Sequence, residues 1–330
     1  MNAGRVLIAA LLAACALIAA GCGGGDDGDT DKPPAVARPE DFPTAQGKTL
    51  AELRQSLPDG GPVLAPAVSQ LTVGANRFGF GLFDRGRNQI ADAQVALYFA
   101  PLGGGKVRGP VVASWQSLKV DAPFQSKTVK LDKDAARSVY VAGLTFPKAG
   151  KYEVLGIARL DDRLVAATSA GPPLTVQPKG RDQVPAVGDQ APVIHTPTEA
   201  DVGGDMAKID TRTPPDDMHD VDFADVVGKQ PVVLVFATPL LCQSRVCGPV
   251  VDIAEQVKSE LGDKAAFIHM EIYNDNEIAK GERPQVRAWH LPSEPWAFAI
   301  DRDGRIVERI EGAYSAEELT AAAKKAISDS

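Results

Sequence analysis

The sequence predicts a multidomain chain in which an all-β sandwich is followed by an α/β domain. Residues 70–177 contain about seven short segments in which apolar and polar residues alternate, with turn residues between them and no convincing helical pattern. After residue 192 the pattern changes to alternating strands and helices, which is typical of α/β folds. We therefore expect the sandwich at residues 66–178, a proline- and glycine-containing linker at 179–192 and the α/β domain at 193–330.

The first residues read MNAGRVLIAALLAACALIAAGC and have the layout of an export signal. Arg5 precedes an apolar run that is short for crossing a bilayer, which needs roughly 20 residues. The ending AAGC resembles a bacterial lipobox, although alanine stands three residues before the cysteine where leucine is usual. The resemblance implies cleavage of residues 1–21, lipidation of Cys22 and anchoring on the extracytoplasmic face of the cell membrane. The alternative is an uncleaved anchor helix.

The segment after Cys22 is rich in Gly, Asp and Pro and has little to bury, so we predict a flexible tether over residues 22–65. The formal net charge is -8, and no cluster of Lys and Arg appears. Because phosphate contacts need such clusters, nucleic acid is not an expected partner.

The cysteine count points to one pair. Of four cysteines, Cys15 falls in the signal and Cys22 in the lipobox, which leaves Cys242 and Cys247. Outside the cytoplasm two neighbouring cysteines are expected to form a disulfide with each other unless a reductant maintains them.

The sandwich is predicted from clear alternation. In NRFGFGLFD (Asn76–Asp84) Phe78, Phe80 and Leu82 share one face. The segment FPKAGKYEV (146–154) resembles the turn into a late strand of immunoglobulin-like domains, where a tyrosine, here Tyr152, lies at the corner. The resemblance implies an immunoglobulin-like sandwich. Since this region has no cysteine or histidine, we expect a structural or partner-binding module without a metal site.

The α/β domain opens with VVLVF (Val232–Phe236), an apolar run that suits a strand buried on both faces. Apolar residues then recur at helical spacing in VVDIAEQVKSEL (250–261). A further strand follows at 265–273, a hairpin is predicted around the turn sequence DRDG (301–304), and a capping box from Ser315 opens the last helix.

This order of elements, from about Gly188 onward, resembles the thioredoxin superfamily. The segment GDQAP (188–192) is similar to the G-x-x-A-P sequence of the redoxin and peroxiredoxin branches, and the cysteines follow the central strand at the head of a helix. The resemblance implies a cis peptide bond at Pro295, beside the cysteines. It also implies a thiol–disulfide oxidoreductase without a cofactor, whose partner is a protein or small-molecule thiol or disulfide.

The chemistry expected of the pair is electrostatic. A helix N-terminus carries partial positive charge and unpaired N–H groups, which stabilise a thiolate, and a second cysteine can resolve a mixed disulfide. Arg245 would add positive charge if its side chain turns inward. The spacing is C-x-x-x-x-C and not C-x-x-C, because Val250 follows Cys247-Gly-Pro. In one helix, residues five apart point about 140° apart, so Cys242 must lie in the loop before the helix.

Several readings of the pair stay open. Either cysteine could attack. Ser244–Cys247 after Pro239 resembles the peroxiredoxin motif P-x-x-x-T-x-x-C, with serine for threonine and one extra residue, which would make Cys247 peroxidatic. A non-catalytic thioredoxin-like module with a structural disulfide is the main alternative to an oxidoreductase. Two cysteines with His269 or His290 also resemble the copper-ligand set of Sco-type chaperones, with different spacing.

The long connector before the central strand, residues 201–225, contains TPPDDMHD. We expect it to be solvated, or alternatively to form a lid over the cysteines, and we assign no function to Met218 or His219.

Overall fold

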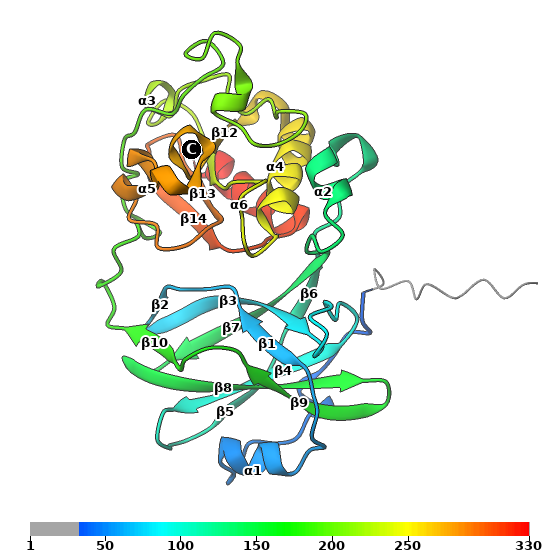
Figure 1. Ribbon diagram of the computed structural model, residues 1–330. Coiled ribbons are helices and arrows are strands. Elements are labelled where there is room, and N and C mark those ends of the chain that lie inside the picture. The colour runs from blue at the N-terminus through cyan, green and yellow to red at the C-terminus, as the bar shows by residue number, and fades with distance from the viewer. Residues whose placement is uncertain (1–32, 330) are drawn as a thin grey trace, which may run out of the picture.

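The computed structural model describes residues 33–329, so the predicted signal and Cys22 lie outside the described residues. Two domains follow one another, an all-β domain and an α/β domain, and they stack end to end (Figure 1). Among residues 33–329, no helix combines the length and the apolar character needed to cross a bilayer.

The N-terminal domain consists of strands that pair in two groups. One group runs β6-β7-β3-β1, the other runs β5-β4-β8-β9, and a short parallel pairing of β1 with β9 joins them. Strands β10 and β2 extend the second group beside β8. The strands are β1 (Val63–Pro66), β2 (Leu71–Thr72), β3 (Gly74–Phe83), β4 (Gln94–Pro101), β5 (Arg108–Val112), β6 (Ser114–Ser117), β7 (Ser138–Phe146), β8 (Gly150–Leu160), β9 (Arg163–Ser169) and β10 (Leu174–Gln177).

The alternation predicted from the sequence produces the core of this domain. Phe78, Phe80 and Leu82 of β3 are fully buried and pack in one cluster with Leu97 and Phe99 of β4. Because side chains alternate between the two faces of a strand, this cluster fills the space between the two groups of strands.

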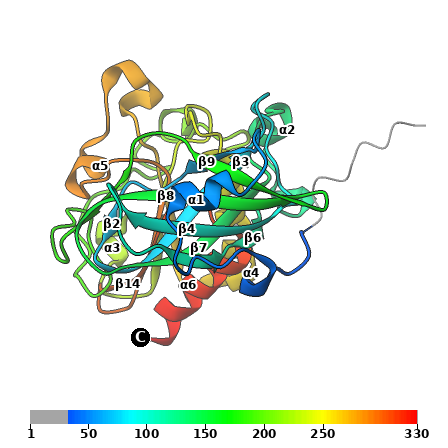
Figure 2. The ribbon, with the colours of Figure 1, turned by 90° about the horizontal axis from the view of Figure 1, so that it is seen from below.

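The predicted tether differs from the structure. From residue 39 the chain packs on the outer face of β4 and β8 through the 3₁₀ helix η1 (Pro39–Asp41) and the helix α1 (Leu50–Gln55) (Figure 2). Phe42 and Leu53 are buried there, and the Tyr98 hydroxyl donates a hydrogen bond of 2.6 Å to the Pro43 carbonyl. Over residues 39–65 the flexible-tether prediction is therefore wrong, because a few well-placed apolar residues cover an exposed sheet face.

The connection between β6 and β7 reaches the second domain. It contains η2 (Ala122–Phe124) and α2 (Lys127–Leu131), helices that the sequence analysis did not predict. Helix α2 contacts α4 of the second domain (Figure 1). The two helices lie so close that a Cβ atom added to Gly248 of α4 would lie 2.9 Å from Cγ2 of Val129 in α2.

The C-terminal domain is a mixed sheet of order β12-β11-β13-β14, in which only β11 and β12 are parallel. Helices α4 and α6 pack on one face of the sheet, and a second apolar cluster that includes Trp289 covers the other. The elements are η3 (Met206–Lys208), α3 (Phe223–Val226), β11 (Val232–Phe236), α4 (Cys247–Leu261), η4 (Gly262–Lys264), β12 (Ala266–Met270), η5 (Asn274–Asn276), η6 (Ile278–Lys280), α5 (Pro284–Ala288), β13 (Trp296–Ile300), β14 (Ile306–Glu311) and α6 (Ala316–Ser328).

Arg77 of β3 links the two domains. Its guanidinium donates to both carboxylate oxygens of Glu318 at 2.6 and 2.8 Å, and to the carbonyls of Glu311 and Ala313 at 2.9 and 2.7 Å. Such paired, charge-assisted bonds fix orientation as well as adding stability. The sandwich is thus docked on the α/β domain in a defined way.

Candidate redox site

The cysteines occupy the position that the spacing argument required. Strand β11 ends at Phe236, and Cys247 is the first residue of α4. Cys242 lies in the intervening loop and forms a disulfide with Cys247, with 6.0 Å between their Cα atoms. Cys247 is fully buried in the core beneath α4, whereas Cys242 is only partly buried. An external reagent therefore meets Cys242 first.

The start of α4 suits a developing thiolate. The helix is 15 residues long, its N-cap residue Val246 forms no side-chain capping bond, and its first turn contains no acidic residue. The free N–H groups and the positive end of the helix dipole thus face the sulfur of Cys247 without a competing carboxylate in that turn.

The Glu294–Pro295 peptide bond is cis, which the resemblance implied. The next residue, Trp296, pairs with Phe236 at the point where β11 leads into the cysteine loop. Glu294, which the sequence analysis missed, brings a carboxylate oxygen within 4.8 Å of both cysteine sulfurs. The sequence feature that could have identified Glu294 is its position directly before the proline expected to be cis.

Glu294 is suited to move protons. Burial is the main cause that raises the pKa of its carboxyl to about 7, and the nearby negative charge of Glu271 adds to the effect, while a hydrogen bond with Tyr273 opposes it. Its Oε2 atom is buried without a hydrogen-bond partner. A carboxyl that titrates near neutrality can either donate or accept a proton at the disulfide.

Arg245 does not have the role predicted for it. Its guanidinium forms ion pairs with Asp132 and, at 3.1 Å, with Asp134, both in the β6–β7 connection. Its carbonyl also accepts a hydrogen bond of 3.1 Å from the Ala136 N–H. Two carboxylates thus offset its charge, so Arg245 ties the cysteine loop to the sandwich and does not supply net positive charge to a thiolate.

A cavity of about 740 Å³ opens beside Cys242. The cysteine loop and the start of α4 form one wall, and α2 with the residues after it forms the other. Two large apolar side chains of this lining, Leu131 and Leu240, are 81% and 65% exposed. The cavity therefore combines a partly exposed sulfur with exposed apolar side chains.

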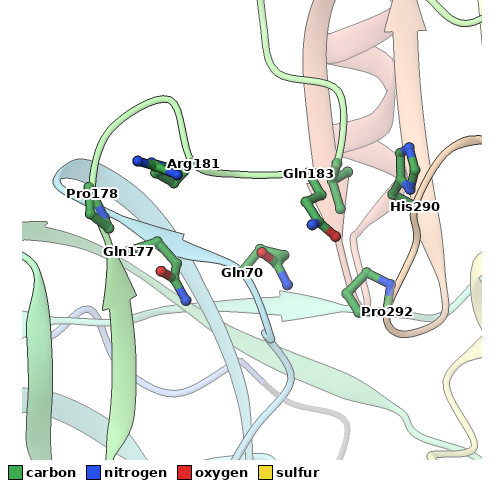
Figure 3. Close-up of a pocket in the computed structure, with 8 residues that line it drawn as sticks. Gln70, Gln177, Pro178, Arg181, Gln183, His290 and Pro292 are labelled. Atoms are coloured by element: carbon green, nitrogen blue, oxygen red, sulfur yellow. The ribbon is translucent and has the colours of Figure 1, made fainter.

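The histidines do not join the cysteines. His290 lines a separate cavity of about 560 Å³ with Gln70, Gln177 and Pro292, where no cysteine is present (Figure 3). His269 lies in a buried group with aspartates. Within residues 33–329, the potential ligand group that contains both cysteines includes Glu294 and no histidine. The copper alternative therefore lacks its histidine ligand.

We had expected the connector before β11 to be solvated, but part of it is buried. Asp216, Met218 and His219 are buried. Thr213 lines the cavity beside Cys242, and the Leu240 N–H donates a hydrogen bond of 3.1 Å to Oγ1 of Thr211. The connector thus supports the cysteine loop from inside the domain.

No protein-family model matches the chain, and no curated protein matches it. Among solved structures, one described as a thiol:disulfide interchange protein DsbE from Chlorobium tepidum is similar to 43% of this chain over 99% of its own, with 17% identity and a TM-score of 0.32. A thioredoxin family thiol:disulfide interchange protein from Chlorobium tepidum TLS matches 43% of this chain and 98% of its own, with 15% identity and a TM-score of 0.31. The apo form of Trgpx matches 41% of this chain and 93% of its own, with 15% identity and a TM-score of 0.27.

The C-terminal domain has a thioredoxin-like fold. The domain has the sheet order β12-β11-β13-β14, a helix that begins at Cys247 after the central strand, and a cis bond before Pro295, which together define this fold.

Proposed function

We propose that the protein is a thiol–disulfide oxidoreductase in which the Cys242–Cys247 disulfide exchanges with a thiol or disulfide of a protein partner. The observation that carries the proposal is the position of the disulfide. The buried sulfur lies at an uncapped helix N-terminus, the other lies at a cavity, and the Glu294 carboxylate lies within 4.8 Å of both sulfurs.

In the oxidising direction, a substrate thiolate attacks Sγ of Cys242. The bond between the two cysteine sulfurs breaks, and Cys247 leaves with the electron pair as a thiolate, which the start of α4 stabilises. Protonated Glu294 can give this thiolate a proton. A second substrate thiolate then attacks the substrate sulfur of the mixed disulfide and releases Cys242. The substrate loses two electrons and gains a disulfide, while the pair becomes a dithiol. The reverse sequence reduces a substrate disulfide.

The cavity beside Cys242 supports a proposal about how a partner binds. A partner segment in it would contact Leu240 on the α/β side and Leu131 on the sandwich side, so both domains would contribute to recognition. Apolar contacts of this kind position a cysteine-containing segment without selecting one sequence strictly. The sandwich would then act in substrate binding in addition to carrying the redox domain.

The sandwich is proposed to be immunoglobulin-like. The strand pairing supports this proposal, because β1-β3-β7-β6 correspond to the ABED sheet of constant-type domains and β4-β8-β9 to their CFG sheet, with β5 as one additional strand beside β4. The Tyr152 hydroxyl also donates a hydrogen bond of 2.9 Å to the Lys148 carbonyl, as in a tyrosine corner.

We also propose that the protein is exported and anchored in the cell membrane by lipid on Cys22. The apolar N-terminal run and the AAGC sequence support this. A protein with this location and a net charge of -8 would exchange thiols and disulfides with exported proteins and would not bind nucleic acid.

Trapping of mixed disulfides tests the proposed function. The full-length Cys247→Ser variant keeps the accessible Cys242, and it should form a mixed disulfide with a disulfide-containing peptide, located at Cys242 by mass spectrometry. The matched Cys242→Ser variant keeps the buried Cys247 and should react at least about tenfold more slowly. If neither variant reacts until the protein is unfolded, the disulfide is structural.

A further inference from the structure

A second cluster of chemically active side chains lies inside the α/β domain, apart from the disulfide. Asp210, Asp216 and His219 come from the connector, and His269 comes from β12. All four residues are almost completely buried, with exposed fractions of 3%, 5%, 2% and 0%. Each offers one nitrogen or oxygen atom as a possible ligand, and these four atoms lie within 4.8 Å of one another.

The distances suit a small metal ion. Bonds of about 2.1 Å in a tetrahedral site place neighbouring ligand atoms about 3.4 Å apart. Nε2 of His219 lies 3.4 Å from Oδ1 of Asp216 and 3.9 Å from Oδ2 of Asp210. Nδ1 of His269 lies 4.0 Å from Oδ1 of Asp210 and 2.7 Å from Oδ2 of Asp216. Only the last of these distances is that of a direct hydrogen bond.

The surroundings orient these groups as ligands. Asp210 accepts hydrogen bonds from the backbone N–H groups of Arg212 and Asp216, both at 2.7 Å. Nε2 of His269 donates to the Ala237 carbonyl at 3.1 Å. Since a carbonyl only accepts, Nε2 carries a proton and Nδ1 faces the cluster. Without an ion Nδ1 also carries a proton, which it donates to Oδ2 of Asp216, and a bound metal ion would take the place of that proton. Metal-bound histidines commonly donate their other ring nitrogen to a backbone carbonyl in this way.

His219 gives independent support for a ligand. It is 2% exposed, yet its Nε2 atom, which faces the two aspartates, has no hydrogen-bond partner. An unpaired polar atom in the interior costs about 1–3 kcal/mol. In addition, the Asp216 carboxylate pairs with His269 at 2.7 Å, whereas the Asp210 carboxylate lies 3.9 and 4.0 Å from the two histidines, so its buried charge is compensated less closely. One divalent ion would bond to Nε2 of His219 and neutralise both carboxylates, with its charge in place of the His269 Nδ1 proton.

We propose that Asp210, Asp216, His219 and His269 bind one divalent transition-metal ion, with Zn²⁺ the best match to two imidazoles and two carboxylates in a closed site. A site with four protein ligands and no solvent access is structural, since a catalytic site keeps an open position. The ion would hold the connector to β12. Through the His269–Ala237 hydrogen bond it would also hold the start of the cysteine loop.

Metal analysis of the refolded full-length protein tests this proposal. The chain is unfolded with denaturant and chelator, refolded with Zn²⁺ or with chelator, and dialysed. We expect about one bound ion per chain and a higher melting temperature with Zn²⁺. A Co²⁺ form should show visible d–d absorption without thiolate charge transfer. A cooperatively folded wild-type protein that retains no ion after refolding with Zn²⁺ would overturn the proposal and leave a buried ion-pair network.

Variants locate the ion. His219→Gln and Asp210→Asn should each lose it, whereas His195→Gln, which changes an exposed histidine beside Asp222, should keep it. The Cys242→Ser/Cys247→Ser double variant should also retain about one ion per chain. Loss of the ion in the cysteine double variant, or its retention in folded His219→Gln, contradicts the assignment. If His219→Gln fails to fold, the wild-type stoichiometry and the Co²⁺ spectrum still decide.

Discussion

Replacing Glu294 by glutamine should change how the stability of the oxidised protein depends on pH. The carboxyl of Glu294 has its pKa raised from 4.5 to about 7, chiefly by burial. The unfolded chain therefore loses this proton near pH 4.5, while the folded protein keeps it until about pH 7. Because the folded state binds more protons in that window, Glu294 makes the protein less stable as pH rises through it.

The size of the effect follows from the two pKa values. At about 1.4 kcal/mol per pH unit, the difference between 4.5 and about 7 amounts to an upper limit of about 3 kcal/mol. Partial exposure of Glu294 to solvent reduces this to about 1–3 kcal/mol. Relative to wild type, Glu294→Gln should therefore gain stability at about pH 8 and gain little at about pH 4.

Denaturant unfolding of both oxidised proteins at about pH 4, 6 and 8 measures this difference. Other buried carboxyls that titrate in this range cancel in the comparison. Glu153→Gln, in which an exposed carboxylate of β8 is changed, controls for the loss of one negative charge. A stability difference between wild type and Glu294→Gln that stays constant across the three pH values would refute the reasoning.

Two further predictions concern the docked domains. Arg77→Ala should lower the free energy of unfolding by about 2–3 kcal/mol, because it leaves the half-buried Glu318 without its paired donors. Arg163→Ala, which changes an exposed residue at the start of β9, should cost less than about 0.5 kcal/mol in the same denaturant titration. Leu131→Ser should reduce kcat/KM for a protein disulfide by about tenfold and leave the rate of exchange with a small disulfide nearly unchanged, because only a protein substrate would reach α2. An equal loss for both substrates would contradict a substrate-binding role for the Leu131 side chain.

The parts of the fold that the sequence predicted depend on local signals. The apolar run of β11, the helical spacing of α4 and the DRDG turn are each contained in a few neighbouring residues, and the structure has these elements where they were expected. The requirement that Cys242 lie before the helix came from helix geometry alone, and the structure agrees.

The parts that the sequence did not predict depend on contacts between distant residues. Arg245 pairs with Asp132, which lies 113 residues earlier in the other domain, and no local pattern links the two. His269 meets Asp216 across 53 residues. Likewise, Phe42 and Leu53 are too sparsely spaced to show an amphipathic pattern, and their burial follows only from the sheet face that they cover.

The reduction potential of the Cys242–Cys247 pair tests the central claim most directly. It is measured in the full-length protein by equilibration with glutathione redox buffers, with quantification of free thiols at Cys242 and Cys247. A working oxidoreductase should have a potential above about -300 mV, within the range of exchange with partner thiols. A potential well below that value, together with no mixed disulfide at Cys242, would show that the pair is a structural disulfide.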